Sequence, residues 1–241
     1  MKVVVIIPAA GLGTRMAPAP AKGKKHVASK QFTELNGTPI LIHTLRNFAA
    51  VPQVAEILIA LRESEIDGFR ARLEAEANDI LRKPIQFVEG GEHRQQSVAN
   101  ALAAVKAAPG DIVLVHDAVR PFVTSEIIED VIKAAEKHGA AIAGMPASDT
   151  IKQVERTAEG AVINSTIPRE RVVMAQTPQG FRYEVIRKAF DEATADGFMG
   201  TDEASLVERS GHVVAVVMGS PRNIKITTPA DMELAEFYLK K

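Results

Sequence analysis

The first residues suited to chemistry form a glycine-containing loop near the N-terminus. The run AAGLGTR, Ala9 to Arg15, directly follows an apolar, strand-like stretch, Val3–Ile7. Glycines let the backbone approach a ligand closely, and successive N–H groups at such a turn can bind an anion. The loop is not a dinucleotide fingerprint, because Met16 stands where the third glycine belongs, and no Walker A lysine follows. On these residues alone, a tight strand-to-helix turn is the alternative.

Basic residues follow this loop without a compensating carboxylate. No acidic residue occurs before Glu34, and the cations in between are Arg15, Lys22, Lys24, Lys25 and Lys30. Arginine offers a planar fork and lysine a movable point charge, and both suit the charge that develops on phosphate oxygens during group transfer. A run of charge is more often a solvated face, but this one adjoins a candidate phosphate loop. The combination favours a polyphosphate ligand.

A second polar group follows another apolar run. In VLVHDAVRPF, Val113 to Phe122, Asp117 comes just past the strand-like residues. A carboxylate there suits Mg²⁺ that bridges nucleotide phosphates, since this ion usually takes one or two protein carboxylates. Arg120 is placed to bind the phosphate of a second substrate. The alternative is that Asp117 and Arg120 pair only with each other.

Two further segments carry weaker signals. In EGGEHRQQSV, Gly90 allows close backbone approach and Ser97 is a candidate hydrogen-bond partner for a base or ribose. A glycine turn that opens a helix is the alternative there. Near the C-terminus, Lys225 stands between Ile224 and Ile226, so its ammonium group must point at a partner.

The pattern around these motifs predicts the fold class. Apolar β-branched runs alternate with amphipathic stretches, which predicts an α/β protein with a mostly parallel sheet and helices on both faces. Ligands bind such sheets at the carboxyl ends of the strands. Thr124 is a predicted helix N-cap. The predicted strands are 3–7, 57–60, 85–88, 112–115, 141–145 and 213–217, and the predicted helices are 39–48, 63–78, 94–107, 125–138 and one from about Pro229.

One segment interrupts this alternation. Residues 148–171 read as two polar-alternating strands joined near Gly160, a hairpin poorly suited to a core. Its edges would be exposed unless it packed on a partner, so we expect an arm that forms a homodimer. A solvated surface hairpin is the alternative.

Composition limits the remaining possibilities. The 241 residues are 46% hydrophobic, which fits a single α/β domain over 1–241. Lys+Arg 29 against Asp+Glu 30, with Trp 0, gives no sign of a nucleic-acid or membrane surface. With Cys 0 there is no disulfide framework or thiolate site. The run Val3–Ile7 is too short for a signal peptide or membrane span, so we expect a cytoplasmic protein.

The motifs together resemble one enzyme family over essentially the whole chain, from Val3 to about Leu239. They occur in the order PAAGLGTRM, SKQF, GGEHRQQSV, HDAVRPF, DTIK, AQTPQGF, TDEASLVE and NIKITTP. In this order they resemble the 2-C-methyl-D-erythritol 4-phosphate cytidylyltransferases of non-mevalonate isoprenoid synthesis. The resemblance implies a Rossmann-like nucleotidyltransferase sheet and Mg²⁺-dependent transfer of a cytidylyl group from CTP to methylerythritol 4-phosphate, with release of pyrophosphate.

The resemblance also implies roles for particular residues. The CTP-binding residues would be Ala9, Ala10, Gly11, Gly13, Gly90 and Ser97. Arg15 and Lys30 would stabilise the reacting phosphorus, Asp117 would lie near the metal and both substrates, and Lys225 would bind on the acceptor side. The acceptor phosphate would also contact Arg120 and Thr177, together with Thr150 and Arg169 from the arm of the neighbouring subunit.

Two departures from the family pattern concern the catalytic lysine. The family usually has proline before it, whereas this chain has Ser29. The segment between Met16 and Lys30 is also longer than expected, so Lys24 and Lys25 are alternatives to Lys30. The rival functions are ribitol 5-phosphate cytidylyltransferase, a nucleotide-dependent oxidoreductase and a non-catalytic nucleotide-binding protein.

Overall fold

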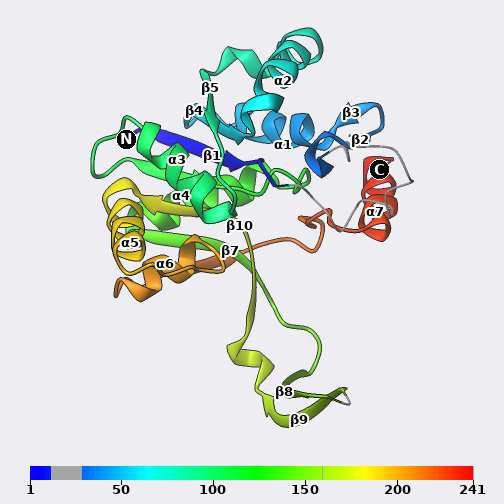
Figure 1. The fold of residues 1–241 in the computed structure, drawn as a ribbon, viewed down its shortest axis with the longest axis vertical. Helices are drawn as coiled ribbons and strands as arrows, with labels where there is room; N and C mark the ends of the chain where they lie inside the picture. Colours follow the sequence, from blue (N-terminus) through cyan, green and yellow to red (C-terminus); the bar gives the residue numbers. More distant parts are fainter. Residues whose placement is uncertain (12–28, 159, 241) are drawn as a thin grey trace.

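A seven-stranded sheet forms the centre of the computed structural model, which describes residues 1–11, 29–158 and 160–240 (Figure 1). The strand order is β11-β7-β10-β6-β1-β4-β5, and each pairing is parallel except those of β10, which runs antiparallel to β6 and β7. The strands are β1 (Val3–Pro8), β4 (Val54–Leu61), β5 (Ile85–Glu89), β6 (Ile112–Val115), β7 (Ala140–Pro146), β10 (Val173–Arg182) and β11 (Ala215–Met218). A small hairpin, β2 (Glu34–Leu35) and β3 (Thr38–Pro39), lies outside this sheet.

Helices cover both faces of the sheet, which explains why the central strands are apolar throughout. Along β1, Val3, Val5 and Ile7 belong to one core cluster, whereas Val4 and Ile6 belong to the other. The first cluster includes side chains of α1 (Ile40–Ala49), α2 (Glu63–Glu76) and α4 (Ser125–His138). The second includes those of α3 (Arg94–Ala104), α5 (Tyr183–Ala195) and α6 (Glu203–Arg209). Helix α7 (Pro229–Leu239) packs against β2 and the loop after β6.

The predicted α/β class with a mostly parallel sheet is confirmed, and several elements agree closely. Helix α4 has the predicted bounds, and the Thr124 hydroxyl accepts a hydrogen bond from the Ile127 N–H at 3.4 Å. Several predicted bounds are wrong by two or three residues. Helix α3 ends at Ala104 because Val105 is extended, and β11 begins at Ala215, whereas Val213 is 82% exposed. Helix α2 ends at Glu76 instead of residue 78, and β4 begins at Val54 instead of residue 57.

Among the strands of the main sheet and the α-helices that cover it, β10, α5 and α6 were not predicted. Strand β10 contains Pro178 and Gly180, which are atypical of a central strand. Its pairing with β7 is interrupted between Ala175 and Gln179, so Pro178 falls where the ladder is irregular. The strand is nevertheless buried over residues 177–181.

The predicted hairpin projects from the body of the molecule (Figure 1). Strands β8 (Ile151–Thr157) and β9 (Gly160–Ile167) pair antiparallel and form a sheet of their own. We call residues 148–171 the arm. Nearly all of its residues are exposed, including Val154, Val162 and Ile163.

Within the described part of the chain, no helix has the length and apolar character needed to cross a membrane.

Candidate active site

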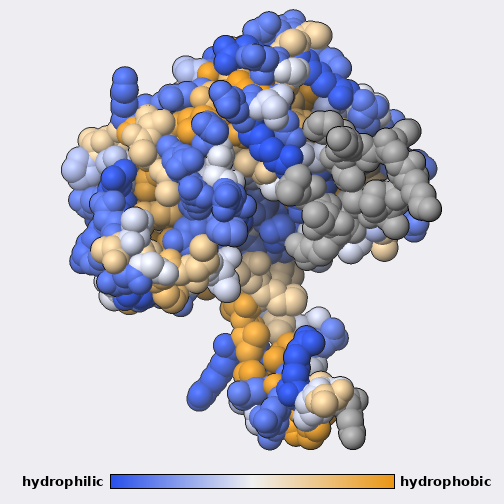
Figure 2. Space-filling view, viewed as in Figure 1, coloured by the Kyte–Doolittle hydropathy of each residue, from blue (hydrophilic) through white to orange (hydrophobic). Residues whose placement is uncertain are grey.

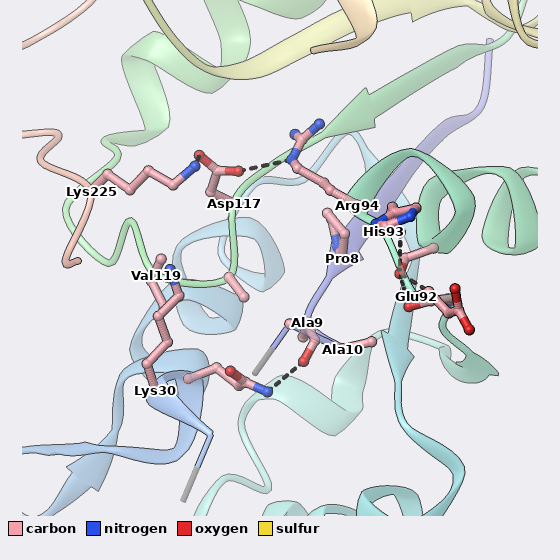
Figure 3. Close-up of a pocket in the computed structure, with 15 residues that line it drawn as sticks. Pro8, Ala9, Ala10, Lys30, Glu92, His93, Arg94, Asp117, Val119 and Lys225 are labelled. Atoms are coloured by element: carbon pink, nitrogen blue, oxygen red, sulfur yellow. Dashed lines mark hydrogen bonds and ion pairs between the residues drawn. The ribbon is translucent and has the colours of Figure 1, made fainter. Parts of the chain in front are cut away.

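A cavity of about 220 Å³ opens at the carboxyl ends of β1 and β6 (Figure 3). We call it the first cavity. It brings together side chains from the start of the glycine loop, the β5–α3 turn, the loop after β6 and the segment before α7. Of the residues predicted from the sequence, its lining contains Ala9, Ala10, Gly11, Lys30, Ser97, Asp117 and Lys225. Gly13, Arg15, Lys24 and Lys25 lie outside the described residues.

Backbone and hydroxyl groups around the first cavity are held by close packing. Gly90 lies against the glycine loop, where a Cβ atom would come within 2.4 Å of the Ala10 Cβ. The Ser97 hydroxyl is buried and accepts a hydrogen bond from the Gly91 N–H at 3.0 Å. Gly90 and Ser97 therefore shape the turn that forms one wall of the cavity.

Three cations converge on the Asp117 carboxylate. Lys225 Nζ lies 2.9 Å and Arg120 Nε 3.1 Å from Oδ2, and Arg94 Nε lies 3.2 Å from Oδ1. Figure 3 shows Asp117 between Lys225 and Arg94. Burial by itself would raise the pKa of Asp117, but the charges of Arg94, Lys225 and Arg120 outweigh it and hold the pKa well below its usual range. Asp117 is therefore ionised at neutral pH. The local ion pair between Asp117 and Arg120, the alternative raised from the sequence, is therefore present. Asp117 also forms ion pairs with Arg94 and Lys225, which are distant in the chain.

Sequence reasoning missed Arg94 and its buried partner Glu203. Arg94 Nη1 donates to both carboxylate oxygens of Glu203, at 2.6 and 2.8 Å. Burial raises the pKa of Glu203, and the adjacent guanidinium opposes that shift. The two residues stand in the motifs GGEHRQQSV and TDEASLVE, so charged residues within those motifs were the available signal. We call Asp117, Arg94, Arg120, Lys225 and Glu203 the Asp117 cluster.

A buried histidine, also missed, supports the loop that carries Asp117. Thr177 Oγ1 lies 3.0 Å from His116 Nδ1 and accepts a hydrogen bond from the Asp117 N–H at 3.1 Å. His116 Nε2 lies 3.1 Å from the Arg120 carbonyl oxygen. A neutral ring that donates from Nε2 and accepts at Nδ1 satisfies all three contacts. Burial lowers the pKa of His116 to about 4, which agrees with the neutral form.

A second cavity, of about 210 Å³, adjoins the first. We call it the second cavity. The two share Arg94, Asp117 and Lys225, and the second is also lined by Arg120 and Thr177. The Asp117 cluster therefore separates two spaces, both bordered by cations. This geometry suits two anionic ligands that meet at the shared wall.

The two predicted arm residues lie elsewhere. Neither Thr150 nor Arg169 lines either cavity. Both are exposed, and Arg169 Nη1 donates to the Ser148 carbonyl oxygen at the base of the arm. Within one chain, the structure does not bring these residues to the Asp117 cluster.

The donor groups constrain how a metal ion could bind. Among residues 1–11, 29–158 and 160–240, no group of three His, Cys, Asp or Glu side chains could hold an ion. Asp117 has about four lone-pair positions, and its ion pairs use three. The site therefore fits an ion that takes one protein oxygen and draws its other ligands from bound phosphates and water.

Comparison with known proteins gives a consistent result. The family model for IspD, 2-C-methyl-D-erythritol 4-phosphate cytidylyltransferase, matches residues 3–241. Proteins of that name from Acidobacterium capsulatum and Solibacter usitatus are 59% and 50% identical; each alignment covers 100% of this chain, and 98% and 97% of the relative. The crystal structure of the Francisella tularensis enzyme of that name superimposes with a TM-score of 0.79 at 34% identity, covering 98% of this chain and 99% of that one.

Proposed function

The chain belongs to the 2-C-methyl-D-erythritol 4-phosphate cytidylyltransferase family, and from that premise we propose that it transfers the cytidylyl group of CTP to 2-C-methyl-D-erythritol 4-phosphate. The products are 4-diphosphocytidyl-2-C-methyl-D-erythritol, a precursor in non-mevalonate isoprenoid synthesis, and pyrophosphate. The observation that carries the proposal is the pair of adjoining cavities that share Asp117, Arg94 and Lys225.

We assign the first cavity to CTP. The exposed backbone at Gly11 and the close turn at Gly90 leave room for a triphosphate beside Lys30. Lys30, which lines this cavity, is our candidate for the cation at the α-phosphate, whereas Lys24 and Lys25 lie outside the described residues. The glycine-loop residues Gly13 and Arg15 keep the roles that the family resemblance implies for them. Removing one such charge costs about 2.7–4 kcal/mol of transition-state stabilisation, by analogy with loss of one oxyanion donor.

We assign the second cavity to the phosphate of the acceptor, which Arg120 and Lys225 would bind. An oxygen of this phosphate attacks the α-phosphorus of CTP, the bond to the β-phosphate oxygen breaks, and its electron pair leaves with pyrophosphate. The acceptor phosphate is already an anion near neutral pH, so the reaction needs no strong general base. The main barrier is repulsion between two anions, which cations on both sides of the shared wall lower.

We propose Mg²⁺ as the cofactor, with Asp117 as its protein ligand. Support comes from the remaining lone-pair capacity of this carboxylate and its position between the cavities. A bound magnesium ion would neutralise phosphate charge. The chain's own cations supply the rest of the positive charge at the site.

We also propose that the enzyme is a cytoplasmic homodimer, with residues 1–241 acting as one nucleotidyltransferase domain. Thr150 and Arg169 would enter the second cavity of the partner subunit, where Thr177 also faces the acceptor. The exposed apolar side chains of the arm support this assignment, because they have no core of their own to pack into. A cytoplasmic location suits a reaction that consumes CTP.

Pyrophosphate release from purified protein with CTP, Mg²⁺ and each polyol phosphate tests the proposal. We expect turnover to require methylerythritol 4-phosphate. Faster turnover with ribitol 5-phosphate would assign the enzyme to that substrate instead. The absence of release with either acceptor would favour a non-catalytic nucleotide-binding protein, and a fluorescence titration with NADH tests the oxidoreductase alternative.

A further inference from the structure

Two charged residues at the start of α2, Arg62 and Glu65, contact the backbone or side chains of Ala10 and Ser29, which stand in the sequence on either side of residues 12–28. Arg62 Nε donates to the carbonyl oxygen of Ala10 at 3.0 Å. Glu65 Oε1 accepts a hydrogen bond from the Ser29 hydroxyl at 2.6 Å. Arg62 Nη1 lies 4.0 Å from the same oxygen of Glu65. Neither Arg62 nor Glu65 lines the first cavity, and among the described residues they connect to it through Ala10 and Ser29.

The contacts hold Lys30 from both sides along the chain. Ser29, which precedes it, is 3% exposed and bound to Glu65. Gln31, which follows it, is 2% exposed, and its side-chain amide donates to the carbonyl oxygen of Ala9. Lys30 itself lines the first cavity, across from Ala9 and Ala10 (Figure 3). A short bond between a hydroxyl and a carboxylate is among the stronger hydrogen bonds, so Glu65 is well suited to fix this point of the backbone.

The position of Ser29 makes its bond to Glu65 informative. The family to which this chain belongs usually carries proline at the position of Ser29. The Ser29 backbone has φ −61° and ψ 135°. Proline fixes φ near −65°, so serine in this chain adopts the conformation that a proline ring would impose. Serine does not impose it covalently. The bond to Glu65 supplies an alternative constraint from a neighbouring element.

We infer that Glu65, together with Arg62, is a positioning residue for nucleotidyl transfer: its hydrogen bond to Ser29 holds Lys30 at the first cavity. This inference rests on the proposed function, because the position of Lys30 matters only if phosphate reacts there. Electrostatic stabilisation requires donors that are fixed before the reaction. A displacement of about 1 Å can lower a rate on the order of 100-fold.

The direct test compares Glu65→Ala with Glu63→Ala. Glu63 stands in the same first turn of α2 with an exposed side chain, so the second variant removes the same charge without touching Ser29. For Glu65→Ala we expect kcat to fall roughly 10- to 100-fold, with Tm and the Kd for CTP near the wild-type values. For Glu63→Ala we expect near wild-type kcat. Equal kcat in wild type and Glu65→Ala, or equal losses in both variants, would overturn the inference.

A double-mutant cycle with Ser29→Pro separates positioning from a general structural role. Since proline supplies the constraint itself, Glu65→Ala should cost less than about threefold in a Ser29→Pro background. A loss of the same size in both backgrounds contradicts the inference. If Ser29→Pro does not fold, Glu65→Gln decides, because it retains an oxygen acceptor and should recover most of the activity lost in Glu65→Ala. Inactive wild-type protein would instead refute the proposed function, so the two failures are distinguishable.

Discussion

The Asp117 cluster and the arm use polar residues in opposite ways. Around Asp117, side chains from three distant segments meet within 3.2 Å, and the carboxylate is almost fully buried. In the arm, Lys152 bonds to Thr166 and Ser165 to Gln153, so these polar contacts stay within one hairpin. Apolar residues of the arm face outward instead of inward (Figure 2). The ion pairs of the cluster form within one chain, whereas the apolar side chains of the arm stay exposed within one chain.

The largest effect is expected at the first cavity. Replacing Lys30 with Ala should lower kcat about 100- to 1,000-fold, because a preorganised charge at the α-phosphate is lost. The oligomeric state should not change, since Lys30 lines a cavity of the body and is not part of the arm. Steady-state kinetics measure kcat, and calorimetric titration measures the Kd for CTP, which should change much less than kcat. Unchanged kcat would remove Lys30 from the mechanism and reopen the assignment of Lys24 and Lys25.

Low pH should reduce the free energy of unfolding because His116 is buried in its neutral form. Its pKa is about 4 in the folded protein because of burial, against about 6.5 when exposed. The unfolded chain therefore binds more protons between these values, and the free energy of unfolding falls as pH drops from 6.5 towards 4, by roughly 3 kcal/mol from this group. Denaturant titrations of wild type and His116→Gln measure the slope. Parallel pH profiles for the two proteins would show that His116 does not cause the fall in the free energy of unfolding at low pH.

Mixing two inactive variants tests whether the arm completes the site of a partner. Arg169→Ala should lower kcat/KM for the acceptor roughly 100-fold, comparable with the loss of a positioned charge. In mixed dimers of Arg169→Ala and Lys30→Ala, one of the two sites would be intact, so activity should return to about a quarter of the wild-type value at random assortment. No recovery in verified mixed dimers would mean that each site is built from one chain.

A smaller effect is expected from the exposed face of the arm. Ile163 is 59% exposed and pairs across the hairpin with Val154. If the proposed dimer forms through this face, replacing Ile163 with Lys should weaken it about tenfold by placing a charge in an apolar contact, with little change in the stability of the body. Analytical ultracentrifugation measures the dimer, and Thr157→Lys at the exposed tip is the matched control. Equal dissociation constants for wild type and Ile163→Lys would show that this face of the arm is a solvent-exposed surface and does not form a dimer contact.

Local sequence signals predicted some parts of the fold closely. The apolar stripe of α4 and its capping residue Thr124 are encoded within a few residues, so its bounds could be predicted. Strand β10 could not be, because Pro178 and Gly180 argue against a strand locally, and pairing with β6 and β7 overrides them.

The candidate site likewise contains residues that could be predicted from the sequence and residues that could not. Lys30, Asp117 and Lys225 could be selected because each stands in a distinctive motif, and the lysine at 225 needed a partner among apolar neighbours. Glu203 was not selected, although its motif offered a signal, because its burial and its pairing with Arg94, 109 residues away in the chain, are visible only in the structure. His116 resembles any buried residue at a strand end until its contacts with Thr177 and Arg120 are known.

By itself, the sequence determined the alternation of apolar strands and amphipathic helices that defines the fold class, and elements with strong local signals such as α4, because hydrophobic periodicity and capping act over a few residues. It also determined family membership, through the order of its motifs. The tertiary structure decided which charges meet, since ion pairs and hydrogen bonds depend on distances of a few ångströms between segments far apart in the chain. The bond between Ser29 and Glu65 belongs to this second kind, because no local pattern connects a serine to a carboxylate 36 residues further along.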